Sequence, residues 1–217
     1  MARSQDPGNE LYSHSTSYQL PAEMIRDNAL AASGLLVARL GGPPVRPYEV
    51  AVSFKPVKRD DGAGLYRRSV YTYWKRTGPA PAMMALDASK RDICVVKRER
   101  TSSPVQALVL LNDPQLVEAS RVLAHRLVAG HGGDIEGIVV EAFRRLTSRR
   151  PSTEEKELLV QLYQEQREHY SAHPDAAAAL LATGEARPAG ELPADQVAAV
   201  SMMVNMLMNF DACVMKK

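Results

Sequence analysis

Apolar residues recur at the spacing of an α-helix along most of this chain. After Pro21, the residues Ile25, Ala29 and Leu36 share one helical face. Pro21 suits the first turn of such a helix, because its missing N–H group would have no partner there. The sequence Gly-Gly-Pro-Pro at 41–44 predicts the end of this helix, since proline cannot continue the hydrogen-bond ladder.

Capping signals predict three further helix starts. Ser103 and Asp113 each stand directly before a proline, which combines an N-cap side chain with a residue suited to the first turn. Ser152 and Glu155 have the spacing of a capping box. An apolar stripe follows each of these signals, and a further stripe runs through 135–146. These signals therefore predict a series of amphipathic helices.

The helix that begins at Asp113 has two distinct sides in the sequence. Leu116 and Leu123 share its apolar side, which we expect to be buried. The charged and polar residues Glu118, Arg121 and His125 fall on the other side, which we expect to face water.

The last predicted helix, about residues 195–214, is apolar nearly all round and should lie at the centre of a bundle. No stretch shows the alternation of a strand, so we predict an all-α fold, an irregular helical bundle with long loops rich in proline and glycine. We expect residues 1–217 to form a single helical domain, with the loops 41–65 and 183–193 as surface insertions.

Three polar residues interrupt the last helix. Ser201, Asn205 and Asn209 stand four residues apart, so they lie on one face of a helix that should be buried. A buried amide without a partner costs about 1 to 3 kcal/mol, and we expect backbone groups of loops to satisfy them. An interface with another domain is the functional alternative.

Residues 66–76, "YRRSVYTYWKR", which we call the basic aromatic segment, are the most unusual stretch. Their pattern fits a helix or a strand, and the helical context favours a helix. Seven cationic residues against two acids occur in 55–76, and five against two in 90–100. This local charge predicts an anionic ligand or partner. The predicted ligand-binding residues are Arg67, Arg68, Tyr71, Tyr73, Trp74, Lys75, Arg76, Arg98, Arg100 and Asn112.

The sequence also allows a structural interpretation of the same residues, which is the commoner one for clusters of ionisable residues. The cations could pair with acids such as Asp92 and Glu99, or stack on tyrosine and tryptophan rings. Asp87 and Asp113 are the candidate catalytic acids because both flank the basic region, although Asp113 already has a role as a helix cap. His169 and His173 have the spacing of a metal clamp, but further ligands are not evident, so we expect no metal site.

Composition narrows the classes of function. The net charge of +2 is too small to attract nucleic acid along the whole chain. The most apolar stretch, residues 197–210, is 14 residues long, whereas a membrane span needs roughly 20, so we predict none. The polar first residues show no signal peptide, which would leave the chain, as written, in the cytoplasm. Cys94 and Cys213 are compatible with free thiols or with one disulfide.

Several long motifs occur in the order known from one family. They include "LPAEMIRDNALAASGLL", "YRRSVYTYWKRTGPAPAMMALDA", "RERTSSPVQALVLLNDPQLVEASR" and "VNMLMNFDACV". From about Asp6 to its end, the chain resembles the C-terminal part of a planctomycete-specific, cytochrome-associated domain of unknown function (domain of unknown function 1553). The resemblance implies a multidomain, exported or periplasmic protein with a haem-binding module upstream, and no catalytic residues to carry over.

These observations lead to three hypotheses. The first is a helical scaffold or interaction module that holds an upstream domain, a partner protein or an anionic ligand. The second is an enzyme, acting on extracellular polysaccharide or coupled to haem redox chemistry; it comes second because no complete catalytic set is present. The third is nucleic-acid binding, which the small net charge disfavours. We expect no cofactor in this part of the protein; haem would belong to the upstream domain.

Overall fold

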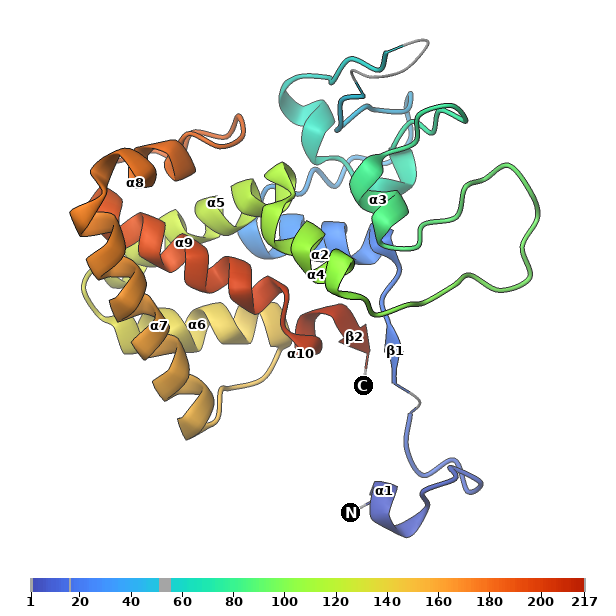
Figure 1. Cartoon of the computed structure of the whole chain (residues 1–217), viewed down its shortest axis with the longest axis horizontal. Coiled ribbons are helices and arrows are strands. Elements are labelled where there is room, and N and C mark those ends of the chain that lie inside the picture. The colour runs from blue at the N-terminus through green and yellow to red at the C-terminus, as the bar shows by residue number, and fades with distance from the viewer. Residues whose placement is uncertain (1, 16, 51–55, 217) are drawn as a thin grey trace.

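The computed structural model describes residues 2–15, 17–50 and 56–216 and is dominated by helices (Figure 1). The α-helices of these residues are α1 (Ala2–Gln5), α2 (Ala22–Ser33), α3 (Pro81–Ala85), α4 (Pro104–Asn112), α5 (Pro114–His131), α6 (Ile135–Thr147), α7 (Thr153–Ala172), α8 (Pro174–Leu181), α9 (Ala194–Met208) and α10 (Asp211–Val214). Two 3₁₀ helices, η1 (Gly62–Tyr66) and η2 (Ser69–Tyr71), and two short strands, β1 (Tyr18–Gln19) and β2 (Met215–Lys216), complete the described elements. The prediction of an all-α, irregular helical bundle is confirmed.

Helix α9 lies inside the bundle, as its all-round apolar sequence predicts. It packs against α5 and α7 along its length and against α8 near its start. Val200, Met203 and Val204 of α9 are fully buried together with Leu123 of α5 and Phe143 of α6. Burial of these side chains is the main stabilising contribution to this part of the fold.

The predicted helix 195–214 is broken in the structure. Helix α9 ends at Met208, Phe210 has an extended backbone, and α10 follows. The break lets the chain turn so that Met215 pairs with Gln19 in an antiparallel ladder and Leu20 N donates to Val214 O at 2.8 Å. A continuous helix could not reach β1 in this way.

The predicted helix starts are confirmed by hydrogen bonds. The Ser103 hydroxyl accepts from Gln106 N at 3.3 Å, and Asp113 Oδ1 accepts from the first N–H groups of α5. Ser152 and Glu155 exchange the two hydrogen bonds of a capping box at 3.1 and 2.8 Å. Each cap satisfies N–H groups that the helix itself cannot pair.

Helix α2 is shorter than the apolar pattern predicts. It ends at Ser33 rather than near Gly41, because Gly34 adopts a left-handed conformation with φ of 70°. In this position the backbone N–H groups of Leu35 and Leu36 both donate to Leu30 O, which closes the last turn. The next residues are extended, and Val37 N donates to Tyr66 O at 2.9 Å.

Two of the three polar residues, Asn205 of α9 and Asn209 directly after it, bond to helix α4 rather than to loops. Asn205 and Asn209 donate their side-chain N–H groups to Leu111 O at 3.0 Å and Ala107 O at 3.2 Å. The Ser201 hydroxyl donates to Val197 O within α9 at 2.6 Å. The expectation of loop partners was therefore wrong, because α4 presents its carbonyl groups directly to α9.

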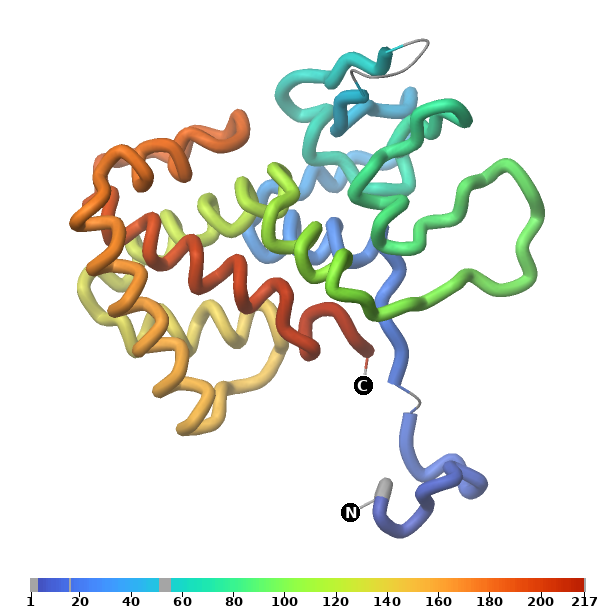
Figure 2. Tube along the Cα trace, viewed as in Figure 1, coloured from blue at the N-terminus to red at the C-terminus, as the bar shows by residue number. Residues whose placement is uncertain are grey.

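The part of the chain between α2 and α4 contains little regular structure. Figure 2 shows it as turns and loops beside the helical bundle, with the loop between α3 and α4 arching away from the body. Isolated bridges join Val37 to Arg67 and Val45 to Thr72. We refer to residues 34–103 as the loop region and to α5, α6, α7 and α9 as the bundle.

Candidate functional site

The basic aromatic segment is not a continuous α-helix, so the prediction of a helix through it was wrong. It consists of the end of η1, the short η2, and extended residues that follow. Its β-branched and aromatic residues favour helices weakly, and its backbone groups bond to other parts of the protein. For example, Tyr73 N donates to Val45 O at 2.7 Å, and Tyr71 O accepts from Val45 N at 2.9 Å.

Arg26 of α2 holds this segment in place through hydrogen bonds. It is only 8 % exposed, and its guanidinium donates to Leu65 O at 2.6 Å, Arg67 O at 2.9 Å and Ser69 Oγ at 3.0 Å. Its Nε donates to Gln115 Oε1 of α5 at 2.7 Å. Burial lowers the pKa of Arg26 to about 10, which still leaves it charged at neutral pH.

Asp27, the next residue, completes this attachment. Its Oδ1 accepts from Ser69 N at 2.8 Å and from Ser69 Oγ at 2.6 Å, and lies 3.6 Å from Arg26 Nη1. We call Arg26 and Asp27 the α2 anchor. Their neighbouring charges and shared partners fasten η2 to helix α2.

Glu118 of α5 forms a second anchor. This carboxylate is 2 % exposed, and its Oε1 accepts from the Tyr66 hydroxyl, from Glu185 N and from Ala186 N, each at 2.7 Å. It therefore connects the basic aromatic segment to the loop between α8 and α9. Burial, and then the bond to the Glu118 carboxylate, raise the pKa of Tyr66 well above its usual range.

Arg121, one turn further along α5, holds the same loop. It is 3 % exposed and donates to Thr183 O at 3.1 Å and to Ala186 O at 2.5 Å. We call Glu118 and Arg121 the α5 anchor. Gly184 lies so close to it that an added Cβ would come within 2.2 Å of the Glu118 carboxyl carbon.

The prediction that Glu118 and Arg121 face water was therefore wrong. The loop between α8 and α9 covers this side of α5 and supplies backbone groups that satisfy both charges. His125, the third polar residue of that face, is half-buried and bonds through Nε2 to Gly190 O at 3.2 Å.

Arg67 is buried, and its guanidinium is used within the protein. It donates to Pro43 O at 3.0 Å, to Arg39 O at 3.2 Å and to Gly41 O. The same group stacks on the Tyr71 ring at 4.0 Å. Tyr71 in turn accepts from Gly41 N at 2.8 Å. These two predicted ligand-binding residues fasten the turn at 39–43.

Asp87 fastens the loop between α3 and α4. Its Oδ2 accepts from Thr101 N at 2.7 Å, Thr101 Oγ1 at 2.7 Å and Gln106 Nε2 at 3.0 Å. Burial raises the pKa of Asp87, but these hydrogen bonds outweigh it and hold the pKa below its ordinary value. A carboxylate stabilised in this way is a poor general base or acid near neutral pH.

Three other predicted residues also have partners within the protein. Arg98 pairs with Glu23 at 3.0 Å, and Arg100 lies over the Tyr18 ring at 4.3 Å. Trp74 donates to Lys90 O at 2.6 Å. Asp87, Arg98 and Arg100 border a hollow of only about 10 Å³, which has room for a single water molecule at most.

The remaining predicted residues lie at the surface. Arg68, Tyr73 and Arg76 are exposed, and Lys75 is half-buried. Asn112 is exposed and donates to Leu108 O within α4 at 2.8 Å. The structure does not bring these residues together with Arg98 and Arg100 in one cavity.

Asp113 borders a larger cavity, of about 430 Å³, between α2, α3, the start of α5 and residues 47–49. Its wall is mostly apolar and includes Ile25, Met83 and Leu116. Arg26 is among its polar lining residues, whereas none of the predicted ligand-binding residues lies among the described residues that line it. This is the α2–α3–α5 cavity, and it has the size and wall of a small-molecule site.

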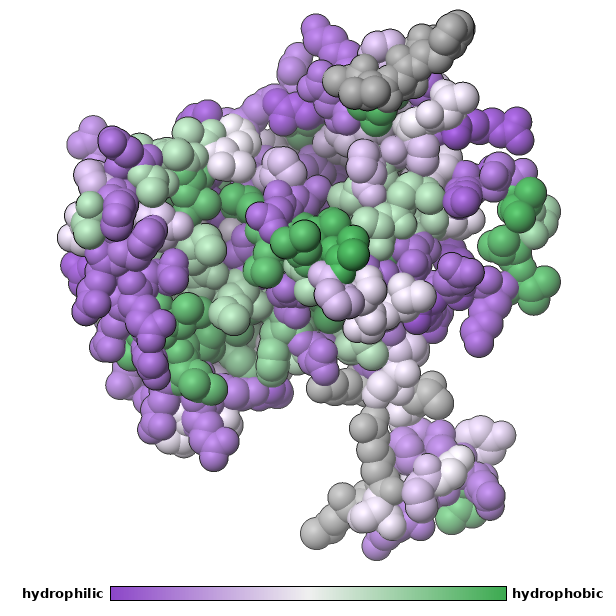
Figure 3. Space-filling model, in the orientation of Figure 1, coloured by the Kyte–Doolittle hydropathy of each residue, from purple (hydrophilic) through white to green (hydrophobic). Residues whose placement is uncertain are grey.

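A different surface gathers exposed apolar side chains. Leu158 of α7 and Met206 of α9 are 66 % and 56 % exposed, and they border a groove of about 330 Å³. Phe210 lies beside them, and Leu108 and Leu111 are exposed on α4. Figure 3 shows two groups of apolar side chains on one face of the molecule, one over α4 and one beside the first turns of α7. We call these five residues the apolar face.

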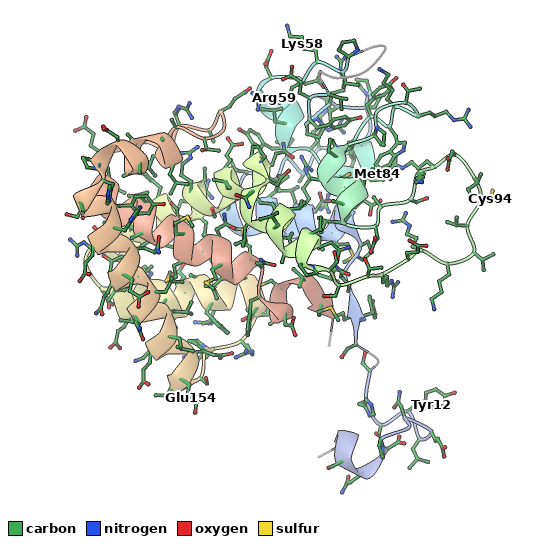
Figure 4. The ribbon with its side chains drawn as sticks, in the orientation of Figure 1. Tyr12, Lys58, Arg59, Met84, Cys94 and Glu154 are labelled. Carbon is green, nitrogen blue, oxygen red and sulfur yellow. The ribbon has the colours of Figure 1, made fainter. Side chains whose placement is uncertain are left out.

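The histidines and cysteines form no larger cluster. His169 and His173 stack at 4.6 Å at the end of α7, and among the described residues no group of three His, Cys, Asp or Glu could hold a metal ion. Both cysteines are free thiols. Cys94 lies at the outer edge of the loop between α3 and α4 (Figure 4), and burial raises the pKa of Cys213 to about 12.

In the part of the chain that the structure describes, no helix is both long and apolar enough to cross a membrane.

The anchors were missed by sequence reasoning. Arg26, Asp27 and Glu118 stand inside helices, where a charged residue ordinarily indicates a solvated face. One sequence signal was present for Glu118 and Arg121: their neighbours Ala119, Val122 and Ala124 are small or apolar and lie on several sides of the helix, and the structure buries this stretch of α5. The acceptors of the arginines are backbone carbonyls, which have no signature in the sequence.

Comparisons with known proteins identify the family. The family model described as PSD1, protein of unknown function (DUF1553), matches residues 1–163. No curated protein and no solved structure matches this chain. The match ends within α7, so the closing motif of α9 and α10 lies outside it, although the resemblance seen in the sequence extended to the end. Because the match covers most of the chain, the protein belongs to the PSD1 family of proteins of unknown function (DUF1553).

Proposed function

We propose that this protein is a helical interaction module that binds another protein domain through its apolar face. The observation that carries the proposal is the exposure of Leu108, Leu158 and Met206 on helices whose other sides are packed in the core. Such exposed apolar surface is characteristic of interaction sites, because a partner removes it from water.

The charges around the groove favour one kind of partner. Helix α7 contains five glutamates and two cations, and the cations Lys156 and Arg167 already pair with Glu136 and Asp195. Glu154 and Glu165 stand one turn before and about two turns after Leu158, on the same side of α7. Figure 4 shows Glu154 at the start of this helix. An amphipathic helix with basic flanking residues would complement this groove.

The internal use of the charged residues also supports an interaction module over an enzyme. An enzyme with Asp87 or Asp113 as acid or base would need those carboxylates to converge with the predicted arginines in a cavity. Arg67, Arg98 and Arg100 instead bond to carbonyls, to Glu23 and to a tyrosine ring. Nucleic-acid binding has no comparable geometric support among the described residues.

The family resemblance suggests where the partner resides. We propose that it is an upstream domain of the same protein, in a planctomycete-specific, exported or periplasmic system associated with a c-type cytochrome. The support for this part is the resemblance of the sequence motifs. Any haem would belong to the partner.

An affinity capture with matched variants tests the function. The full chain, the double variant L158E/M206E and the control V96E would each be exposed to extract from the native organism. Val96 is an exposed apolar residue on the loop between α3 and α4, far from the groove in sequence. We expect the double variant to recover at least about tenfold less of one partner, since central apolar residues dominate interface energies.

Circular dichroism would establish that all three proteins are equally helical. Mass spectrometry would identify the captured protein, and a visible haem spectrum would support the cytochrome association. Equal recovery by the double variant and the wild type would reject the apolar face as the binding surface.

A further inference from the structure

The α2–α3–α5 cavity is independent of the apolar face and uses other helices. Its volume of about 430 Å³ lies within the roughly 300 to 1,000 Å³ of typical ligand sites. Ala22 and Ile25 of α2, Met83 of α3 and Leu116 of α5 supply buried apolar wall. A ligand of this cavity must therefore have an apolar body.

The cationic side chains in the cavity wall already bond to other groups of the protein. Arg26 donates to Gln115, Ser69 and two carbonyl groups. Arg59 pairs with Glu185 at 2.8 Å. Neither guanidinium therefore offers a free charge to an anionic ligand.

Unlike these cations, the carboxylates in the wall have no ion-pair partner among the described residues. Asp113 Oδ1 accepts two N–H groups at the start of α5, and among the described residues no cation lies within ion-pair distance of either Asp113 or Glu49. Both residues line the cavity. A partly buried carboxylate without a counterion would gain from a cationic hydrogen-bond donor.

The titration of Asp113 agrees with this geometry. Burial raises the pKa of its carboxyl, although the N–H groups of Leu116 and Gln115 and the charge of Arg26 act in the other direction. For the Asp113 carboxyl, the effect of burial is therefore larger than that of the groups that stabilise its charge.

We propose that the α2–α3–α5 cavity binds a small organic cation, an ammonium or guanidinium group on an apolar body. The cationic N–H group donates to the Asp113 carboxylate, and Glu49 adds negative charge at the exposed side. The body of the ligand packs on Ile25, Met83 and Leu116. The inference does not rest on the interaction function.

Three probes of similar size and different charge test the proposal on the full chain. They are phenethylammonium chloride, the neutral 2-phenylethanol and the anionic 3-phenylpropanoate, each titrated while ¹H–¹⁵N amide spectra are recorded. We expect the ammonium probe to shift the amides of Ala22, Ile25, Met83 and Leu116, and to bind about tenfold or more tightly than the anion. Equal binding of the anion, or shifts located elsewhere, would overturn the proposal.

Asp113→Asn provides the decisive variant, because an asparagine oxygen still caps α5 while the charge is lost. We expect about tenfold weaker ammonium binding, with Asp113→Ser as a second uncharged cap and Asp92→Asn, at an exposed loop acid, as the control. If both Asp113 variants bind the ammonium as tightly as the wild type does, the cavity does not use this carboxylate and the proposal fails.

Discussion

The bundle and the loop region are held together in different ways. In the bundle, α5, α6, α7 and α9 bury apolar side chains such as Phe143 and Met203. The loop region also buries apolar side chains such as Leu65 and Met83, but polar side chains hold much of its irregular backbone. Arg67, and Arg26 from the neighbouring helix α2, bond to backbone carbonyls, and Asp87 bonds to Thr101. The comparison teaches that a cluster of charged residues can be a means of fastening irregular backbone, whose N–H and C=O groups need partners.

The largest expected effect comes from the core of the bundle. Phe143 is 1 % exposed, and the change Phe143→Ala should reduce the free energy of unfolding by about 3 to 5 kcal/mol, because it removes buried contacts and leaves a cavity. Urea unfolding would measure this, with Leu158→Ala as the exposed control. A loss no larger than that of the control would mean that the core is not where we place it.

The next largest effect should separate the two regions. Arg26→Met keeps the length of the side chain but removes the guanidinium donor to Arg67 O, one of the two side-chain donors to Leu65 O and the positive charge beside Asp27, at a cost of about 3 kcal/mol. Hydrogen exchange should show lost protection at Tyr71 and Thr72, with the amides of α9 still protected.

Arg68→Met is the matched control for this change, since Arg68 is exposed. If Arg26→Met instead exposes the amides of both regions equally, then the loop region and the bundle unfold as one unit and the contrast drawn above is wrong.

The smallest expected effect concerns the capping box of α7. Hydrogen bonds from the Arg149 guanidinium, and then from the backbone N–H group and the side chain of Ser152, hold the pKa of Glu155 at about 2, below its ordinary value of 4.5. Because the folded-state pKa is depressed, the stabilisation is present above about pH 4.5 and disappears as the pH falls toward 2.

The size of this effect should be below about 1 kcal/mol, since the Arg149–Glu155 pair is partly exposed and screened by solvent. Urea unfolding at pH 6 and pH 3, compared between wild type and Glu155→Gln, measures it. If the free energy of unfolding changes between pH 6 and pH 3 by the same amount in the variant as in the wild type, Glu155 is not the source of the pH dependence.

The sequence was a good guide where structure depends on local signals. The caps at Ser103, Asp113 and Ser152 and the central position of α9 follow from residues close together in the chain. The end of α2 was missed because Gly34, a single glycine, overrides an apolar pattern that continues beyond it.

The candidate site was harder to predict, because its partners are distant in sequence. Arg26 meets Arg67 O across 41 residues, and Glu118 meets Ala186 N across 68. The local excess of cationic residues revealed a basic region, but it could not show that Arg67 bonds to carbonyl groups of the protein itself. Asp113 was singled out, whereas the cavity beside it depends on how α2 and α3 pack.

The triple hydrogen bond at Glu118 has a consequence for motion. One oxygen atom accepts from Tyr66 on one loop and from Glu185 and Ala186 on another. When either loop opens, the Glu118 carboxylate loses some of the hydrogen bonds that stabilise its buried charge. The other loop is then held less rigidly. Two surface segments that are more than a hundred residues apart along the chain are thus thermodynamically linked through a single buried atom.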